Sequence, residues 1–321
     1  MKPRIALVTP ALADANNGNW QTAYRWSRFL KGEFEVFTCR EWRGEPADAM
    51  IALHARRSAA SIAAFAQTRQ PLAVVLTGTD LYRDIRSDAS AQASLERATV
   101  LVVLQAQGIE ELPAHLRPRA RVIHQSARTL SPGKPRTRSF DLALVGHLRA
   151  EKDPLTAARA LARLPSPALR LLHAGAVPDD PLGEAFRAAA AADPRIELRG
   201  PLPHAAARQL IRRSRLLVLP SLMEGGANVA IEAVTSGVPV LASRIGGSTG
   251  LMGEDYPGYF PVGDDAALAA LIDRCQASPS FLDSLRSRCA DRAPLFEPAR
   301  EREAVRALAH NLLSTTQDRC S

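Results

Sequence analysis

The stretch RLLVLPSLMEGGANVAIEAVTSGVPVLAS, residues 215–243, carries the pattern that sets the fold class. It predicts an apolar strand, a helix over residues 229–236 and a second apolar strand. Asn228 is a favourable N-cap for this helix, and Gly237 is a favourable residue for its C-terminus. Because both strands are continuously apolar and a helix joins them, we expect parallel strands in a sheet that helices cover on both faces.

The same alternation runs along most of the 321-residue chain. Ala23, Trp26 and Leu30, for example, recur at helical spacing. Further strands are predicted at residues 4–10, 34–38, 49–54, 72–77, 99–105, 121–125, 140–146, 169–175 and 195–200. Further helices are predicted at residues 19–32, 58–69, 182–192, 204–213 and 298–313, with one more that ends near residue 163.

A Pro-rich and basic segment, SPGKPRTRS at residues 131–139, interrupts the alternation and is predicted to be a linker. It separates two α/β domains, residues 1–134 and 135–295, each a doubly wound parallel sheet of Rossmann-like type. Residues 296–321 are predicted to form a last helix that crosses back to the first domain. Open α/β sheets bind ligands beyond the carboxyl ends of their strands, so a central cleft that both domains face is the expected site.

Composition and charge narrow the range of partners. The net charge is +8, but no run of five basic residues occurs and aromatic residues make up 5%, which argues against a nucleic-acid partner. No apolar run reaches the about 20 residues of a membrane span, and the N-terminus shows no secretory signal, so a cytoplasmic protein without a membrane span is expected. The cysteines are scattered, which predicts reduced thiols and no metal site: Cys39, Cys275, Cys289 and Cys320.

Two glutamates flank a glycine turn in EGGANVAIE, residues 224–232. The glycines leave the backbone open to a ligand, and the helix start presents N–H groups that suit a diphosphate. A capping box would place the glutamate where Ile231 stands, so simple capping explains the pattern less well than hydroxyl binding. The residues predicted to bind this ligand are Glu224, Gly225, Gly226, Ala227, Asn228, Val229 and Glu232.

These glutamates, eight positions apart, resemble the E-x7-E motif of retaining glycosyltransferases with the GT-B fold. The resemblance implies that Glu224 contacts the sugar of a UDP-sugar donor and that Glu232 contacts the ribose hydroxyls. The segment VGHLRAEKDPLTAARAL, residues 145–161, is similar to the family motif G-R-L-x-x-E-K-G.

That second motif adds Gly146, His147 and Lys152 to the implied donor site. Lys152 matches the lysine that neutralises the donor diphosphate, whereas His147 replaces the usual arginine. SRIGGSTG at residues 243–250 resembles the second glycine turn of the family, and residues 259–272 resemble its end segment. The resemblance therefore covers most of residues 140–275.

The N-terminal half carries polar residues at the ends of its predicted strands. The turn before the first helix either offers backbone N–H groups to an anion or is an ordinary N-capped Asn-Gly turn. Asp80 either acts in catalysis or caps a helix, and Arg83 either binds an acceptor or pairs with Asp84. The predicted acceptor-binding residues are Asn17, Gly18, Asn19, Arg56, Arg57, Thr77, Gly78, Thr79 and Arg83.

NGNW, ALHARRSA, VVLTGTDLYRDI and VVLQ in this half, with the donor motifs, resemble the selenosugar synthases (SenB-type) of selenoneine biosynthesis. The resemblance implies transfer of a sugar, N-acetylglucosamine in that family, from a UDP-sugar to selenophosphate, which gives a 1-seleno sugar, UDP and phosphate. Lys152 and Glu224 are the implied catalytic residues, and His54 and Asp80 are candidates for assisting phosphorus–selenium cleavage. No D-x-D sequence occurs, so no metal cofactor is expected.

Other functions share these features. A glycosyltransferase that acts on a lipid or saccharide hydroxyl would use the same donor residues. A UDP-sugar epimerase or hydrolase would share the fold without a second substrate. A nicotinamide-dependent oxidoreductase is disfavoured because the G-x-G-x-x-G fingerprint is missing after the first strand. A non-catalytic sugar-nucleotide binding module is disfavoured by the presence of both glutamates and the lysine.

Overall fold

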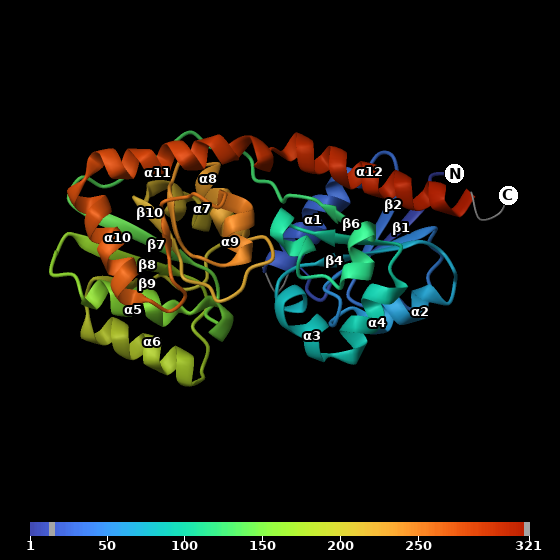
Figure 1. Ribbon diagram of the computed structural model, residues 1–321, viewed down its shortest axis with the longest axis horizontal. Helices are drawn as coiled ribbons and strands as arrows, with labels where there is room; N and C mark the ends of the chain where they lie inside the picture. Colours follow the sequence, from blue (N-terminus) through green and yellow to red (C-terminus); the bar gives the residue numbers. More distant parts are fainter. Residues whose placement is uncertain (13–16, 318–321) are drawn as a thin grey trace. The chain divides into compact units, whose positions relative to one another are not determined.

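The computed structural model describes residues 1–12 and 17–317. The chain forms two compact units (Figure 1). The first comprises Met1–Gln125 together with the C-terminal segment that begins at Pro298, and the second comprises Ser126–Glu297.

The boundary between the units differs from the predicted one at residue 134, because the segment after Gln125 bonds to the second unit. The backbone N–H of Ala127 donates to the carbonyl of Phe296, and that of Leu130 donates to the carbonyl of Thr235. Gly133 lies so close to the backbone of Arg212 that a Cβ would stand 2.4 Å from its carbonyl oxygen. The Pro-rich segment is therefore irregular, but it belongs to the second unit.

The sheet of the first unit contains only parallel strands, in the order β2-β1-β3-β4-β5-β6. The strands are β1 Arg4–Val8, β2 Glu35–Cys39, β3 Ala49–Leu53, β4 Leu72–Leu76, β5 Val100–Val103 and β6 Ala120–Val122. The helices are α1 Gly18–Leu30, α2 Ala59–Ala66, the π-helix η2 Asp80–Asp84, α3 Ile85–Ser87, α4 Ala89–Arg97, the 3₁₀-helices η3 Ala106–Ile109 and η4 Ala114–Arg119, and α12 Pro298–Gln317.

Both faces of this sheet are covered, as the continuous apolar strands predict. Successive side chains of a strand point to opposite faces, and in β1 they enter two different cores. Ile5 and Leu7 pack into the core that contains residues of α1 and α12. Ala6 and Val8 pack into the core that contains residues of α2 and α4. The predicted doubly wound architecture is confirmed.

The sheet of the second unit is also parallel, in the order β12-β11-β10-β7-β8-β9. Its strands are β7 Phe140–Val145, β8 Leu169–Ala174, β9 Ile196–Leu198, β10 Leu216–Leu219, β11 Val240–Ser243 and β12 Tyr259–Phe260. Its helices are the 3₁₀-helix η5 Ala150–Lys152, α5 Pro154–Ala162, α6 Pro181–Ala192, α7 His204–Arg213, α8 Asn228–Val234, α9 Gly246–Met252, α10 Asp265–Ala277, α11 Pro279–Arg292 and the 3₁₀-helix η6 Ala293–Phe296. One face of the sheet carries α5 and α6, and the other carries α7 and α8 (Figure 1).

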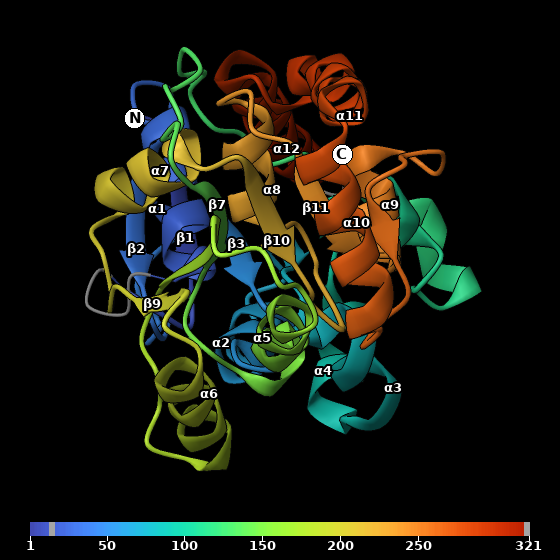
Figure 2. The same ribbon diagram turned by 90° about the vertical axis from the view of Figure 1, so that its left-hand side faces the viewer.

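The strand order reverses once in each sheet. In the second unit the chain builds β8 and β9 on one side of β7 and then returns to place β10 on its other side, so β7 and β10 lie side by side (Figure 2). In the first unit the corresponding point lies between β1 and β3. The crevice at the carboxyl ends of such a strand pair is the preferred ligand site of doubly wound sheets.

Two local expectations are wrong. The glycine turn expected in residues 243–250 is the start of helix α9. Asn228 is the first residue of α8 rather than its N-cap, because the extended residue before the helix is Ala227, whose side chain makes no cap. The two-residue strand β12 was not predicted, because it is too short to show a period.

Cys39, Cys275 and Cys289 form no disulfide, while Cys320 lies outside the described residues. No helix within residues 1–12 and 17–317 combines the length and the apolar character needed to cross a membrane.

Helix α12 is held to α1 by one buried carboxylate. Glu301 is 2% exposed. Arg25 donates from Nε to its Oε2 at 2.6 Å, and the indole Nε1 of Trp26 donates to its Oε1 at 2.7 Å. A buried charge is tolerated only with partners of this kind. The last helix therefore depends on a polar anchor as well as on its apolar face.

Replacement of Glu301 by Ala is expected to destabilise the first unit by about 3 kcal/mol, because the guanidinium of Arg25 and the indole N–H of Trp26 lose their acceptor. All three tryptophans, Trp20, Trp26 and Trp42, lie in this unit, so tryptophan fluorescence during urea unfolding reports on it. Glu303→Ala, on an exposed position of the same helix, is the matched control and should change the midpoint little. Equal midpoints for the two variants would contradict the anchor.

Candidate functional site

An ion pair lies at the carboxyl ends of β7 and β10, where the strand order reverses. Lys152, the last residue of η5, donates from Nζ to Oε1 of Glu224 at 2.5 Å. Ser221 donates from Oγ to the same oxygen at 2.7 Å. Glu224 is 6% exposed, whereas the lysine side chain is 32% exposed. A buried acceptor and a more exposed cation therefore stand together at the expected ligand crevice.

The loops that carry this pair are joined through their backbones. The N–H of Leu222 donates to the carbonyl of Glu151 at 2.9 Å, which ties the loop after β10 to the turn before α5. The start of α9 packs against the same loop, since a Cβ on Gly247 would lie 1.9 Å from the carbonyl oxygen of Glu224. Three segments far apart in the sequence thus position one carboxylate.

The turn after Lys152 has a left-handed residue, Asp153, with φ 40° and ψ 54°. Asp is one of the few non-glycine residues that tolerate this region. Its carboxylate accepts from Oγ1 of Thr156 at 2.6 Å, which fixes the start of α5. The motif G-R-L-x-x-E-K-G has glycine at this place, and the observed backbone explains that preference.

Glycines open the edge of the sheet beside the ion pair. Gly146 follows β7 with φ 139°, and a Cβ there would meet no atom within 4 Å. Gly175 follows β8 and approaches it so closely that a Cβ would lie 1.9 Å from the Gly146 carbonyl oxygen. The backbone at the carboxyl ends of β7 and β8 is therefore bare on the side of Gly146, and the part of Gly146 in binding a donor stays a prediction.

His147 is held in one orientation by the backbone. Its Nδ1 accepts from the N–H of Ala176 at 3.0 Å, so the proton of the neutral ring lies on Nε2. Below it, buried His173 donates from Nε2 to the Gly146 carbonyl at 3.1 Å, and burial lowers the pKa of His173. Where the resemblance implies an arginine, this chain thus has an imidazole whose Nδ1 is bonded to the backbone.

The second glutamate of the motif has a partner that the sequence did not reveal. Glu232 on α8 accepts at Oε1 from Nε2 of His204, the first residue of α7, at 2.6 Å. The two residues are 28 positions apart, and no pattern in the sequence links them. Gly225, Gly226 and Ala227 form the connection between Glu224 and α8. The roles predicted for them, and for Asn228 and Val229, in binding a diphosphate stay predictions.

In the first unit, Asp80 serves the backbone. It is fully buried, and its two oxygens accept N–H groups of Ala55, Thr77 and Gly78, each at 2.9 Å. The carboxylate therefore ties the loop after β3 to the loop after β4. It does not cap the helix that it begins, because the N-cap of η2 is Thr79 and no side chain caps it. A direct part for Asp80 in proton transfer stays a prediction.

Asp84, one turn further, collects two of the predicted arginines. Arg56 donates from Nε to Oδ2 at 2.9 Å, and Arg83 donates from Nε to Oδ1 at 3.1 Å. Asp84 is 4% exposed, while the arginine side chains are 39% and 52% exposed. The pairing of Arg83 with Asp84 was one of the alternatives, but the second arginine on the same carboxylate was not foreseen. The π-helix brings Asp80 and Asp84 to this corner.

His54 follows β3 with φ 72°, a backbone conformation that is costly for a residue other than glycine. Its Nδ1 accepts from the N–H of Arg57 at 3.3 Å, so the neutral ring donates from Nε2 to Oγ1 of Thr79 at 3.2 Å. Burial lowers the pKa of His54 more than the nearby charge of Asp80 raises it. His54 is thus a buried, neutral imidazole beside the point where the strand order reverses.

The turn before α1 matches its structural alternative. Oδ1 of Asn17 accepts from the N–H of Trp20 at 3.1 Å and caps the helix. Gly18 and Asn19 are the first residues of α1. The predicted anion contact of these residues stays a prediction.

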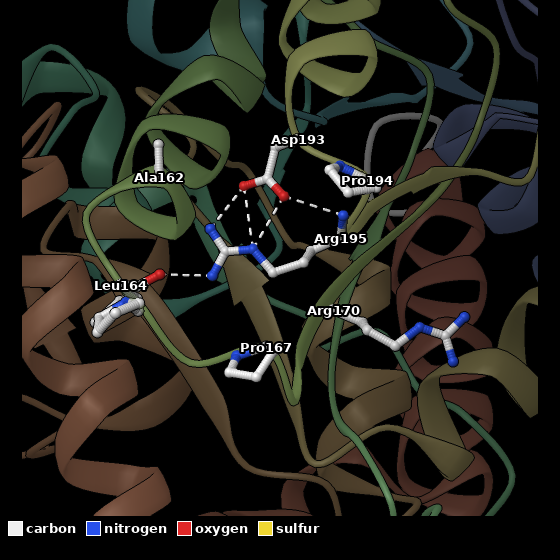
Figure 3. A pocket seen from close by; sticks show the side chains of 8 residues that line it. Ala162, Leu164, Pro167, Arg170, Asp193, Pro194 and Arg195 are labelled. Atoms are coloured by element: carbon white, nitrogen blue, oxygen red, sulfur yellow. Dashed lines mark hydrogen bonds and ion pairs between the residues drawn. The ribbon is translucent and has the colours of Figure 1, made fainter.

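An open pocket on the second unit lies at the opposite edge of its sheet (Figure 3). It is lined by the segments that lead into β8 and β9, at their amino ends. Arg195 spans it, bonded to Asp193 and to the Leu164 carbonyl (Figure 3). These bonds hold loops together, and none of the predicted site residues lines this pocket. In the part of the chain that the structure describes, no group of three or more His, Cys, Asp or Glu side chains is arranged to hold a metal ion.

Comparison with known proteins finds a family match within the second unit and the same fold over nearly the whole chain. Residues 139–278 match the family model described as Glycosyl transferases group 1. The D-inositol 3-phosphate glycosyltransferase of Nocardia farcinica is 29% identical over 207 residues, which are 60% of this chain and 40% of that protein. The protein of the same name from Corynebacterium efficiens is 33% identical over 138 residues, 40% of this chain and 32% of that protein. The chain thus spans less than half the length of the curated relatives it matches.

Solved structures match over nearly the whole chain. Sucrose-phosphate synthase from Thermosynechococcus elongatus superposes with a TM-score of 0.78 at 18% identity, covering 98% of this chain and 100% of that one. HepE from Anabaena, solved in complex with UDP-glucose, gives a TM-score of 0.76 at 14% identity, covering 96% and 100%. The fold is therefore that of the GT-B glycosyltransferases.

The stability of the first unit is expected to fall as the pH drops below about 6.5, the ordinary pKa of histidine. Because burial lowers the pKa of His54, the unfolded chain binds a proton at a pH where the folded unit does not. The loss of stability therefore levels off only below the pKa of His54 in the folded unit. His54→Asn tolerates the left-handed backbone and removes the titration, so its urea midpoint should fall less between pH 7.5 and 5.5.

The measurement is tryptophan fluorescence during urea unfolding at both pH values. His115→Asn is the matched control, since the His115 side chain is 65% exposed. A pH dependence in His54→Asn as steep as in the unaltered protein would show that other groups cause it.

Proposed function

We propose that this chain is a glycosyltransferase that moves a sugar, N-acetylglucosamine, from a UDP-sugar to selenophosphate. The selenium atom attacks the anomeric carbon, a carbon–selenium bond forms, and the bond from that carbon to the diphosphate breaks, which releases UDP. Water then cleaves the phosphorus–selenium bond. The products are a 1-seleno sugar, UDP and phosphate.

The observation that carries the donor half is the ion pair of Lys152 and Glu224 at the reversal of strand order. A carboxylate with 6% exposure can accept hydrogen bonds from sugar hydroxyls, and the ammonium beside it is suited to a diphosphate. Negative charge grows on the departing diphosphate during glycosyl transfer, so a fixed cation there lowers the barrier. Bare backbone at Gly146 leaves room for the ligand.

The names of similar proteins support the same donor. The matched family is one of glycosyl transferases, and HepE was solved with UDP-glucose. Both relatives matched in sequence are named as glycosyltransferases. For this chain, a UDP-sugar is the donor that agrees with these names and with the paired glutamates.

The acceptor half of the proposal rests on the sequence resemblance and on the cluster around Asp84. Arg56 and Arg83 each donate a hydrogen bond from Nε to the Asp84 carboxylate. These bonds orient the terminal nitrogens of both guanidinium groups, while the side chains stay partly exposed. Guanidinium groups suit phosphate oxygens. Selenophosphate is already an anionic nucleophile, so it needs an anion site more than a strong base. Neutral His54 beside this cluster stays the candidate for assisting the later cleavage.

A second candidate acceptor follows from the curated relatives, whose name specifies D-inositol 3-phosphate. A phosphorylated polyol would offer the arginine cluster the same phosphate chemistry and would attack through a hydroxyl. That reaction requires a base that takes the hydroxyl proton. Because burial lowers the pKa of His54, its imidazole is a weaker base than an ordinary histidine.

The test combines purified protein with UDP-N-acetylglucosamine and follows UDP release and product mass. Separate reactions contain selenophosphate, thiophosphate, D-inositol 3-phosphate or no acceptor, each with and without EDTA. A selenium-containing sugar formed only with selenophosphate supports the proposal. UDP release without any acceptor would indicate a hydrolase or epimerase, and product with inositol phosphate alone would favour the second candidate. Loss of activity in EDTA would overturn the expectation of a metal-free reaction.

Lys152→Gln is expected to lower kcat/KM for the UDP-sugar by about a hundredfold or more, because the departing diphosphate loses its cation. Lys134→Gln removes an exposed lysine of the same unit and should change kcat/KM less than twofold. Steady-state kinetics with varied donor measure both. Equal kinetics for the two variants would remove Lys152 from the site.

A further inference from the structure

The hydrogen bond between His204 and Glu232 in the second unit has no role in the proposed function as stated so far. His204 begins α7, which crosses from β9 to β10, so its side chain lies at the carboxyl edge of the sheet. Its Nε2 stands 2.6 Å from Oε1 of Glu232. The imidazole is 46% exposed, but the carboxylate that it holds is 9% exposed.

This pair differs from other histidine–glutamate pairs in the described chain. His115 contacts Glu96 at 2.8 Å, and His310 contacts Glu33 at 2.9 Å. Those glutamates are 55% and 38% exposed, so water screens them and the pairs add little. Glu232 is shielded, so a donor to its carboxylate has a larger effect on where the carboxylate points.

Helix α7 supplies a second charged group to the same carboxylate. Arg208 lies one turn after His204, is 9% exposed and senses the negative charge of Glu232. Its Nη2 is committed to the carbonyl of Arg128 at 2.7 Å, so it contributes charge without bonding the carboxylate. His204 is therefore the residue of α7 that fixes the rotation of the Glu232 carboxylate.

We propose that His204 is a positioning residue for the nucleotide. By donating to Oε1 of Glu232, it turns Oε2 toward the ribose hydroxyls of the UDP-sugar. Among the described residues, no side chain or backbone group bonds Oε2 of Glu232. This inference rests on the proposed function, because it takes a UDP-sugar as the ligand. The predicted effect is on nucleotide affinity, whereas the chemical step is left nearly unchanged.

The experiment is calorimetric titration of the full chain with UDP and with 2′,3′-dideoxy-UDP, which lacks the ribose hydroxyls. His204→Ala should weaken UDP binding about tenfold, since a hydrogen bond to a charged group is lost. The same variant should bind dideoxy-UDP as the unaltered protein does. His204→Gln keeps an N–H donor of similar reach and should recover UDP affinity to within about threefold.

His115→Ala is the matched control, because it breaks a histidine–glutamate pair on an exposed surface. Steady-state kinetics add a second readout, in which His204→Ala raises KM for the UDP-sugar about tenfold while kcat changes less than twofold. Thermal unfolding of each variant checks that the fold is retained.

The outcomes separate this inference from the function on which it rests. Absence of UDP binding by the unaltered protein overturns the proposed donor and this inference with it. UDP binding that is equal in the unaltered protein and His204→Ala overturns the role of His204 alone. Equal weakening for UDP and dideoxy-UDP also overturns it, because the loss would then not pass through the ribose hydroxyls. Failure of His204→Gln to recover affinity would show that the N–H donor is not the property that matters.

Discussion

The bond between Lys152 and Glu224 joins two loops that the strand order forces together. β7 opens the second sheet and β10 returns beside it, so their carboxyl ends meet although 72 positions separate the two residues. Glu224 would be costly to bury without a cation and a hydroxyl donor, and both are present. The packing of α9 on this loop and the hydrogen bond from Leu222 to the turn before α5 fix the backbone that carries this carboxylate.

The first unit also has buried carboxylates with hydrogen-bond partners near its reversal of strand order, but with different residues. Its reversal of strand order lies between β1 and β3, and His54 follows β3 in a strained conformation. Asp80 holds three backbone N–H groups, and Asp84 holds two guanidinium groups. In both units, then, buried carboxylates at the carboxyl edge are satisfied by loops or cations. Such networks keep polar groups in a fixed place within otherwise apolar surroundings.

Much of the architecture follows from short-range patterns. Continuous apolar strands that alternate with helices predict a parallel sheet covered on both faces, and both sheets are of this kind. The spacing of Glu224 and Glu232 and the segment around Lys152 pointed to the residues that the structure brings to one edge of the second sheet. The predicted boundary at residue 134 differs from the division of the chain after Gln125, because Ala127 and Leu130, which precede the proline-rich segment, bond to the second unit.

The sequence alone determined the α/β class, the strands, the glycine-bearing turns and the glutamate motif, because each of these depends on residues that are close together along the chain. The partners of those residues were decided only in three dimensions. His204 meets Glu232, Ser221 joins Lys152 on Glu224, and Asp84 gathers Arg56 and Arg83. Hydrogen bonds of this kind depend on distances of about 3 Å between side chains whose separation along the chain carries no periodic signal. The crossing of α7 from β9 to β10 supplies that proximity for His204, and no local preference of the chain encodes it.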